Sequence, residues 1–145
     1  MKFATKTLIL GLVMIGGIAL AQSKATDPDV KARQTLMDGN GGAMGVLGGM
    51  AKGEKEFDAA AAEAAKQTLI TNAAGIVAAF QNNATDPESH AKPELWDHLD
   101  ELATYADNLG KAAAALDTSS LDTVKAGIGA IGGACKECHT EFKAS

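Results

Sequence analysis

Apolar residues recur at intervals of three and four along most of the chain, which is the period of an α-helix with one buried face. Four segments carry this pattern, and turn signals separate them. They run from Pro28 to about Lys52, from near Asp58 to near Phe80, from Pro93 to about Leu116, and from the cluster 117–120 to about Lys143. Short links between helices of this length predict an all-α fold, an antiparallel up-down-up-down four-helix bundle.

The first helix has a strong start signal but many glycines. Asp27 is a good N-cap residue, Pro28 suits the first helical position, and Asp29 favours the positive end of the helix dipole. Six glycines then follow, each costing about 1 kcal/mol relative to alanine. One interpretation is that the glycines allow a flat cofactor or another helix to approach closely. The alternative is that the helix is broken or partly irregular in this stretch. We favour close approach, because one helical stripe persists through the segment: Val30, Arg33, Gln34, Met37, Gly41 and Met44.

The fourth helix has the clearest apolar seam, and its two cysteines occupy core positions on that seam. The spacing is that of a heptad repeat, formed by Leu121, Val124, Ile128, Ile131, Cys135, Cys138 and Phe142. The second and third helices are expected to complete the core with Leu69, Ala73, Ile76, Val77, Phe80, Leu95, Leu99, Leu102, Ala106, Leu109 and Ala113.

The N-terminus has the pattern of a secretory signal peptide. Lys2 and Lys6 precede the apolar run 7–18, and a small-x-small site, Ala19-Leu20-Ala21, follows it. The alternative is a membrane anchor, but the run is shorter than the roughly 20 residues that span a bilayer. We therefore expect residues 1–21 to be cleaved and residues 22–145 to form one exported domain in the periplasm, without a membrane segment.

The charge of the expected mature chain is acidic. Lys2 and Lys6 are the charged residues of the signal peptide, so its removal takes the formal net charge from −5 to −7. An acidic surface without a basic run argues against nucleic acid and anionic lipid as partners. It would suit a basic protein partner.

A pentad near the C-terminus, Cys135-Lys136-Glu137-Cys138-His139, is the attachment signature of c-type haem. On a helix its two thiols and its imidazole project from one side, so one turn can hold a porphyrin by two thioether bonds and an iron ligand. A dithiol oxidoreductase would place such cysteines at a helix N-terminus after a strand. A structural zinc site would need a fourth ligand. We therefore expect one covalent haem c, with His139 as the proximal ligand.

The stripe on the first helix suggests further haem contacts. Arg33 and Gln34 could meet the propionates through charge-assisted hydrogen bonds, and Met37 could lie over the iron face opposite His139. The alternative is that Met37 is ordinary core filling and that Arg33 is solvated at the rim.

These motifs together resemble the cytochrome c′ family. The resemblance rests on the pentad followed by Phe142-Lys143, on Arg33-Gln34-x-x-Met37, on Lys52-Gly53-Glu54-Lys55-x-Phe57-Asp58 and on Lys92-Pro93-Glu94-Leu95-Trp96. It implies a haem c bundle anchored by Cys135 and Cys138 and ligated by His139, with Arg33 and Gln34 near the propionates and residue 37 on the distal face. It also implies a homodimer through the first two helices. Lys143 departs from the arginine that is common at its position, which puts a stacked or bidentate role there in doubt.

The resemblance leaves two functions open. Six-coordinate, low-spin relatives use a first-helix methionine as ligand, whereas five-coordinate relatives admit nitric oxide or carbon monoxide. The stretch Leu36-Met37-x-x-Asn40-Gly41 favours His139–Met37 ligation and electron transfer with a redox partner protein; capture of a small gas ligand is the alternative. His90 and His98 are expected to be surface residues. No hydrolase, phosphate-loop or zinc-protease motif is present in the sequence, so we do not expect an enzyme.

Overall fold

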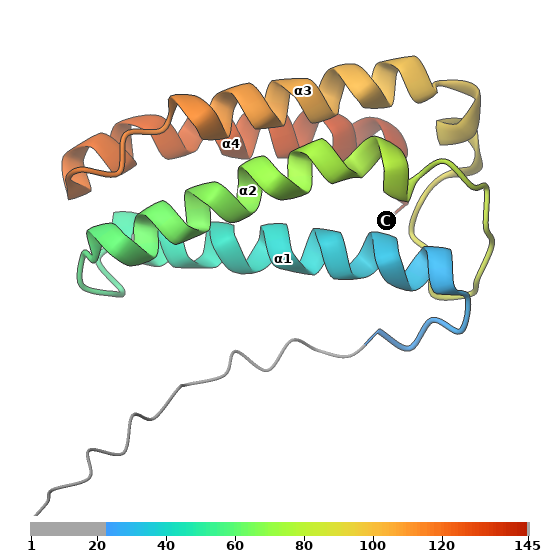
Figure 1. Ribbon diagram of the computed structural model, residues 1–145, viewed down its shortest axis with the longest axis horizontal. Coiled ribbons are helices and arrows are strands. Elements are labelled where there is room, and N and C mark those ends of the chain that lie inside the picture. Colours follow the sequence, from blue (N-terminus) through green and yellow to red (C-terminus); the bar gives the residue numbers. More distant parts are fainter. Residues whose placement is uncertain (1–22, 145) are drawn as a thin grey trace, which may run out of the picture.

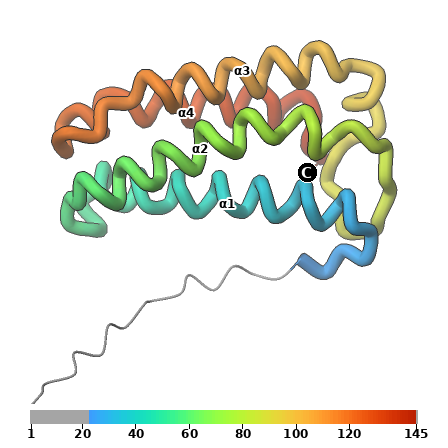
Figure 2. Tube along the Cα trace, in the orientation of Figure 1, coloured from blue at the N-terminus to red at the C-terminus, as the bar shows by residue number. Residues whose placement is uncertain are grey.

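The computed structural model describes residues 23–144 and consists of an antiparallel bundle of four helices (Figure 1). The predicted signal peptide, residues 1–21, lies outside the described residues. The helices are α1 (Pro28–Ala51), α2 (Ala59–Ala79), α3 (Leu99–Ala115) and α4 (Leu121–Phe142). Each packs against the next in the chain, and α4 closes back on α1. The all-α, up-down-up-down prediction is confirmed, and the tube in Figure 2 shows the helices traversing the bundle in alternating directions.

The helices begin where short polar side chains cap them. The Asp27 carboxylate accepts hydrogen bonds from the backbone N–H groups of Asp29 and Val30 at 2.9 and 3.1 Å. Asp58 caps α2 in the same way, and Ser120 forms a capping box with Thr123 at the start of α4. These side chains satisfy N–H groups that have no partner within a helix, which is why the predicted starts of three helices agree with the structure.

The third helix begins later than predicted. Pro93 starts only a short 3₁₀ turn, η1 (Pro93–Asp97), and α3 begins at Leu99. Between them His98 has φ −131° and ψ 40°, which is outside the helical region. The turn is held by its own anchors, since Leu95 is buried and the Trp96 indole donates to the Phe80 carbonyl at 3.0 Å. Pro93 therefore marks the start of a turn, and the prediction that it starts the third helix is wrong.

Helix α1 is continuous through all six of its glycines, so the alternative of a broken helix is wrong. Close approach applies at Gly39, where an added Cβ would lie 2.8 Å from Nδ2 of Asn72 on α2. That Asn72 amide donates to the Leu36 carbonyl at 3.2 Å, which ties α2 to α1 at this point. In contrast, no atom beyond the neighbouring residues and the local backbone of α1 lies within 4 Å of the corresponding position at Gly41, Gly42, Gly45 and Gly48.

The core follows the predicted apolar stripes with a few exchanges. Most of the predicted residues of α2, η1 and α3 are buried, while Val77 and Leu99 are only half-buried. On α4, Val124, Ile131 and Phe142 are buried, and both cysteines are half-buried against the core. On α1 the buried stripe is Val30, Arg33, Asn40, Ala43, Leu47, Gly49 and Met50.

The connection between α2 and η1, residues 81–92, contacts two segments that are far apart in the sequence: the residues just before α1 and the end of α4. The Asp86 carboxylate accepts hydrogen bonds from the backbone N–H groups of Thr26 and Asp27, just before α1. At the other side, Ala144 N–H donates to the His90 carbonyl at 2.8 Å and Lys92 N–H donates to Phe142 at 2.9 Å. The connection therefore joins the start of α1 to the end of α4. Among residues 23–144, no helix is long and apolar enough to cross a membrane.

Candidate haem site

The pentad lies on the last turns of α4, and its three functional side chains reach one space. Cys135, Cys138 and His139 all line a cavity of about 320 Å³, and His139 is an exposed residue at its edge. Both cysteines are free and half-buried. The prediction that the two sulfurs and the imidazole project from one side of a helix is therefore confirmed.

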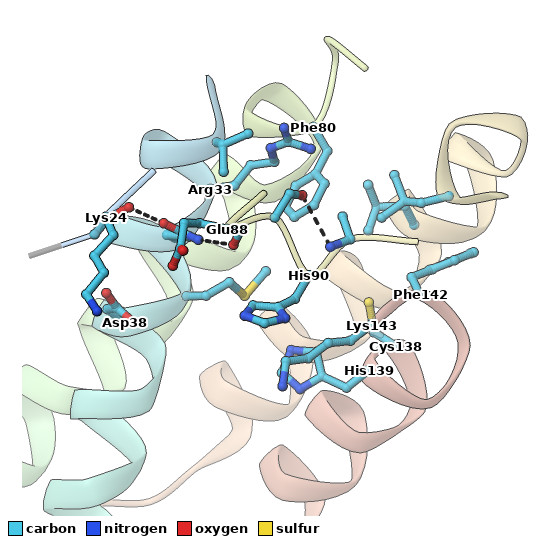
Figure 3. A pocket seen from close by; sticks show the side chains of 18 residues that line it. Lys24, Arg33, Asp38, Phe80, Glu88, His90, Cys138, His139, Phe142 and Lys143 are labelled. Atoms are coloured by element: carbon cyan, nitrogen blue, oxygen red, sulfur yellow. Dashed lines mark hydrogen bonds between the residues drawn. The ribbon is translucent and has the colours of Figure 1, made fainter. Parts of the chain in front are cut away.

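A second, larger cavity of about 470 Å³ is bordered by Cys138 and His139 but not by Cys135 (Figure 3). Met37, Cys138 and His139 border both cavities. The larger cavity extends towards the 81–92 connection and is bordered by Arg33, Gln34 and His90, among others. The smaller one extends along the bundle to Asn40, Gly41, Met44 and Tyr105. Cavities of roughly 300–1,000 Å³ are typical of small-molecule and cofactor sites.

Arg33 is buried, at 4% exposure, so the alternative in which it is solvated at the rim is wrong. Its guanidinium carbon lies 5.4 Å from the ring centroid of Phe80 and 5.0 Å from that of Trp96. Nη2 donates to the Ala84 carbonyl at 2.7 Å, whereas Nη1 is buried without a hydrogen-bond partner among residues 23–144. Burial lowers the pKa of Arg33, and the nearby carboxylates of Asp27 and Asp29 oppose this effect. A guanidinium still stays charged in a protein, so a cation with a free donor lies at this cavity.

Gln34 is held by the chain around it. Its side-chain N–H donates to the Glu88 carbonyl at 2.6 Å, and its carbonyl accepts a hydrogen bond from the Ser23 hydroxyl. Gln34 therefore borders the larger cavity mainly as a link between α1 and the 81–92 connection.

Desolvation shifts the pKa values of the pentad. Burial raises the pKa of the Cys135 thiol, and burial followed by the proximity of Cys135 raises the pKa of Cys138 to about 11. Both cysteines are therefore protonated at neutral pH, which is the opposite of the reactive thiolate of a dithiol oxidoreductase. Desolvation, with a smaller contribution from Lys143, lowers the pKa of His139. The neutral imidazole, which is the form that ligates a metal, is thus favoured.

The residues present fit haem c. The unpaired Arg33 N–H group can donate a hydrogen bond to a propionate at the larger cavity, while mostly apolar side chains line the smaller one. The two thiols and the imidazole border the smaller cavity, and Cys138 and His139 border the larger one as well. Among the described residues no group of three or more His, Cys, Asp or Glu side chains could hold a bare metal ion.

The other two histidines differ in their positions. Both are exposed, as predicted. His98 contacts Glu101 at 3.2 Å at the start of α3. His90, however, borders the larger cavity, and Figure 3 shows its imidazole directed into the same space as that of His139. Sequence reasoning also missed Asn40 and Tyr105 as lining residues; Asn40 is separated from Met37 by a single helical turn, a spacing that could have indicated its place.

Comparison with known proteins gives a consistent result. The family model described as Cytochrome C′ matches residues 29–143. Cytochrome c-556 of Agrobacterium fabrum is 32% identical over 147 residues, which cover 99% of this chain and 95% of that protein. Among solved structures, oxidised R. palustris cytochrome c556 has a TM-score of 0.74 at 31% identity, covering 81% of this chain and 97% of that chain. A ferrous cytochrome c′ variant from Alcaligenes xylosoxidans with bound NO has a TM-score of 0.70 at 27% identity, covering 81% and 94%.

Proposed function

The chain belongs to the cytochrome c′ family and binds haem c, and from this premise we propose that it is a periplasmic electron-transfer protein rather than an enzyme. Haem c supplies a one-electron exchange between ferric and ferrous iron. The residues that would hold it are Cys135 and Cys138, through thioether bonds, and His139, as the proximal ligand. Met37 would complete the coordination from α1.

The observation that carries this proposal is the shared position of Met37 and His139. The two residues come from different helices, α1 and α4, and yet both border both cavities. A thioether and a neutral imidazole that reach the same space can ligate one iron from two sides. A thioether ligand raises the reduction potential of a haem, which suits an electron carrier.

Arg33 supports the same arrangement from the propionate end. Its buried Nη1 has no partner among residues 23–144, and a charged donor in that state is costly unless an anion pairs with it. We infer that a propionate is that anion. Gln34 is the weaker candidate for a propionate contact, because its amide already contacts Glu88 and Ser23.

A second function, capture of nitric oxide or carbon monoxide, is supported by the apolar lining of the smaller cavity. Met44, Ile76, Ala106 and Leu109 leave space next to Met37 and His139 that a diatomic gas would fit. In this function the sixth position would be open and Met37 would only border it. The two functions therefore differ in one property, the coordination number of the iron.

The test is the absorption spectrum of the protein expressed in a periplasm, ferric and ferrous, with and without carbon monoxide. Electron transfer with Met37 ligation predicts a low-spin spectrum that carbon monoxide does not change. A high-spin spectrum that shifts when carbon monoxide is added would contradict Met37 ligation and support gas capture.

The location and partners follow from the sequence. The N-terminal pattern of residues 1–21 supports export, and the acidic mature chain supports a basic redox partner. A homodimer through α1 and α2 remains a prediction.

A further inference from the structure

Asn40 is a buried polar residue whose side-chain oxygen forms no hydrogen bond within the described part of the chain. It lies on α1 and is 6% exposed. Its side-chain oxygen is buried and has no hydrogen-bond partner among residues 23–144. Buried polar atoms are nearly always paired, so an unpaired amide at this depth indicates a partner that is absent from the polypeptide.

The position of Asn40 indicates where this partner lies. Asn40 lines the smaller cavity together with Met37, Cys135, Cys138 and His139. It follows Met37 by three residues on α1, so both side chains project from the same face of that helix. The rest of the cavity lining is apolar apart from the Tyr105 hydroxyl. Asn40 is thus the one residue with an amide side chain among those that line this cavity. It lies on α1 with Met37, whereas His139 lies on α4.

We propose that Asn40 is the hydrogen-bonding residue for the ligand at the sixth position of the iron. A half-turn about the last side-chain bond exchanges the two ends of an amide, so the NH₂ group can take the position of the unpaired oxygen and donate from there. The acceptor is a lone pair on the sixth ligand, either the sulfur of Met37 or a bound diatomic gas. This inference rests on the proposed function, because it requires a haem iron held by His139.

The first experiment uses the ferrous carbon monoxide adduct of the Met37→Ala holoprotein, in which the sixth position is open. Adding Asn40→Leu replaces the amide by an apolar side chain of similar size. We expect the C–O stretching frequency to rise and carbon monoxide to dissociate roughly two- to tenfold faster, as for the loss of one hydrogen bond. Asn108→Leu in the same background is the control, because this exposed residue of α3 undergoes the same exchange of an amide for an apolar side chain and borders neither cavity.

The second experiment identifies the natural acceptor. In the protein that retains Met37, loss of a donor to the sulfur strengthens its donation to ferric iron, so Asn40→Leu should lower the reduction potential. A lowered potential that requires Met37 assigns the sulfur as acceptor. A changed carbon monoxide adduct with an unchanged potential assigns the diatomic ligand. An unchanged potential together with an unchanged adduct overturns the proposal.

Haem attachment separates this inference from the proposed function. Each variant is first checked for covalent haem by mass spectrometry of the denatured protein. Asn40→Ala, which introduces a good helix former, replaces Asn40→Leu if the leucine side chain prevents folding. Absence of haem in the unmodified protein would contradict the proposed function, whereas intact haem with unchanged spectra would contradict only the role of Asn40.

Discussion

The guanidinium carbon of Arg33 lies 5.0 Å from the ring centroid of Trp96. Phe80 lies at 5.4 Å from the same carbon, and the Ala84 carbonyl accepts from Nη2. A single buried cation on α1 thus holds the end of α2, the start of the 81–92 connection and η1 in place. This contact fixes the part of the molecule that borders the larger cavity.

Arg33→Lys should therefore lower the stability of the fold. Lysine keeps the charge but loses the planar fork, the contact with Ala84 and the stacking on the two rings. We expect a loss of about 1–3 kcal/mol in the free energy of unfolding, measured by urea denaturation of the holoprotein followed by circular dichroism. Lys31→Arg, on the exposed face of the same helix, is the control and should leave the midpoint unchanged. An equally stable Arg33→Lys variant would contradict this role.

The importance of Arg33 could be predicted only in part from the sequence. Its place on the apolar stripe of α1 indicated a role at the haem site. The burial between Phe80 and Trp96 could not be predicted, because these rings come from segments about 50 and 60 residues further along the chain, and only tertiary packing brings them together.

Replacing two different glycines of α1 by alanine should have different effects on the free energy of unfolding. Gly45→Ala should raise the free energy of unfolding by about 0.5–1 kcal/mol, since Gly45 is exposed and no atom beyond the neighbouring residues and the local backbone of α1 lies within 4 Å of the added methyl group. Gly39→Ala should lose this gain, because its methyl group would displace the Asn72 amide from the Leu36 carbonyl. Thermal unfolding of the two variants would check this contrast. Equal stabilisation by both would contradict the close approach at Gly39.

The fold was more predictable from the sequence than the site. Helix starts carry local signals, such as Asp27 and Ser120, and those signals agree with the structure. The start of α3 was predicted wrongly because Pro93 is compatible with a 3₁₀ turn as well as with an α-helix, and the choice depends on the burial of Leu95. The pentad was recognised from spacing, whereas the place of Asn40 depends on how α1 and α4 face each other.

Asp86 makes stability depend on pH. Hydrogen bonds from the backbone of Asp27, Glu88 and Thr26 hold the pKa of its carboxyl well below the usual range. The charged form is thus favoured by folding. Its contribution is present above the unfolded pKa of about 3.9 and is lost as the pH falls through the lower folded pKa.

Asp86→Asn should accordingly lower the melting temperature at neutral pH. The difference from the unmodified protein should shrink as the pH falls below about 4, because the carboxyl of Asp86 then binds a proton in the unfolded chain while it stays charged in the fold. Thermal unfolding between pH 7 and pH 3 measures this difference. Asp97→Asn is the control, since the carboxylate of this exposed residue accepts no hydrogen bond in the described part of the chain. A constant difference across this range would contradict the role of Asp86.

The two cysteines should be jointly responsible for haem attachment. In the double variant Cys135→Ala, Cys138→Ala, we expect the denatured protein to have the mass of the polypeptide alone, because His139 ligation does not survive denaturation. Each single variant should retain haem through its remaining thioether bond. Mass spectrometry after acidic denaturation separates these cases, and covalent haem in the double variant would contradict attachment through this pair.

Met37→Ala decides between the two functions proposed for the site. If Met37 ligates the iron, its removal should convert a low-spin spectrum to a high-spin one, lower the reduction potential and allow carbon monoxide to bind. Met50→Leu, at a buried methionine of the same helix that borders neither cavity, should change none of these properties. If Met37 only borders an open site, the unmodified protein is already high-spin and binds carbon monoxide, and Met37→Ala leaves its spin state unchanged. In that case the free space beside Met37 is the gas site itself, and the residue controls how closely a ligand can approach the iron.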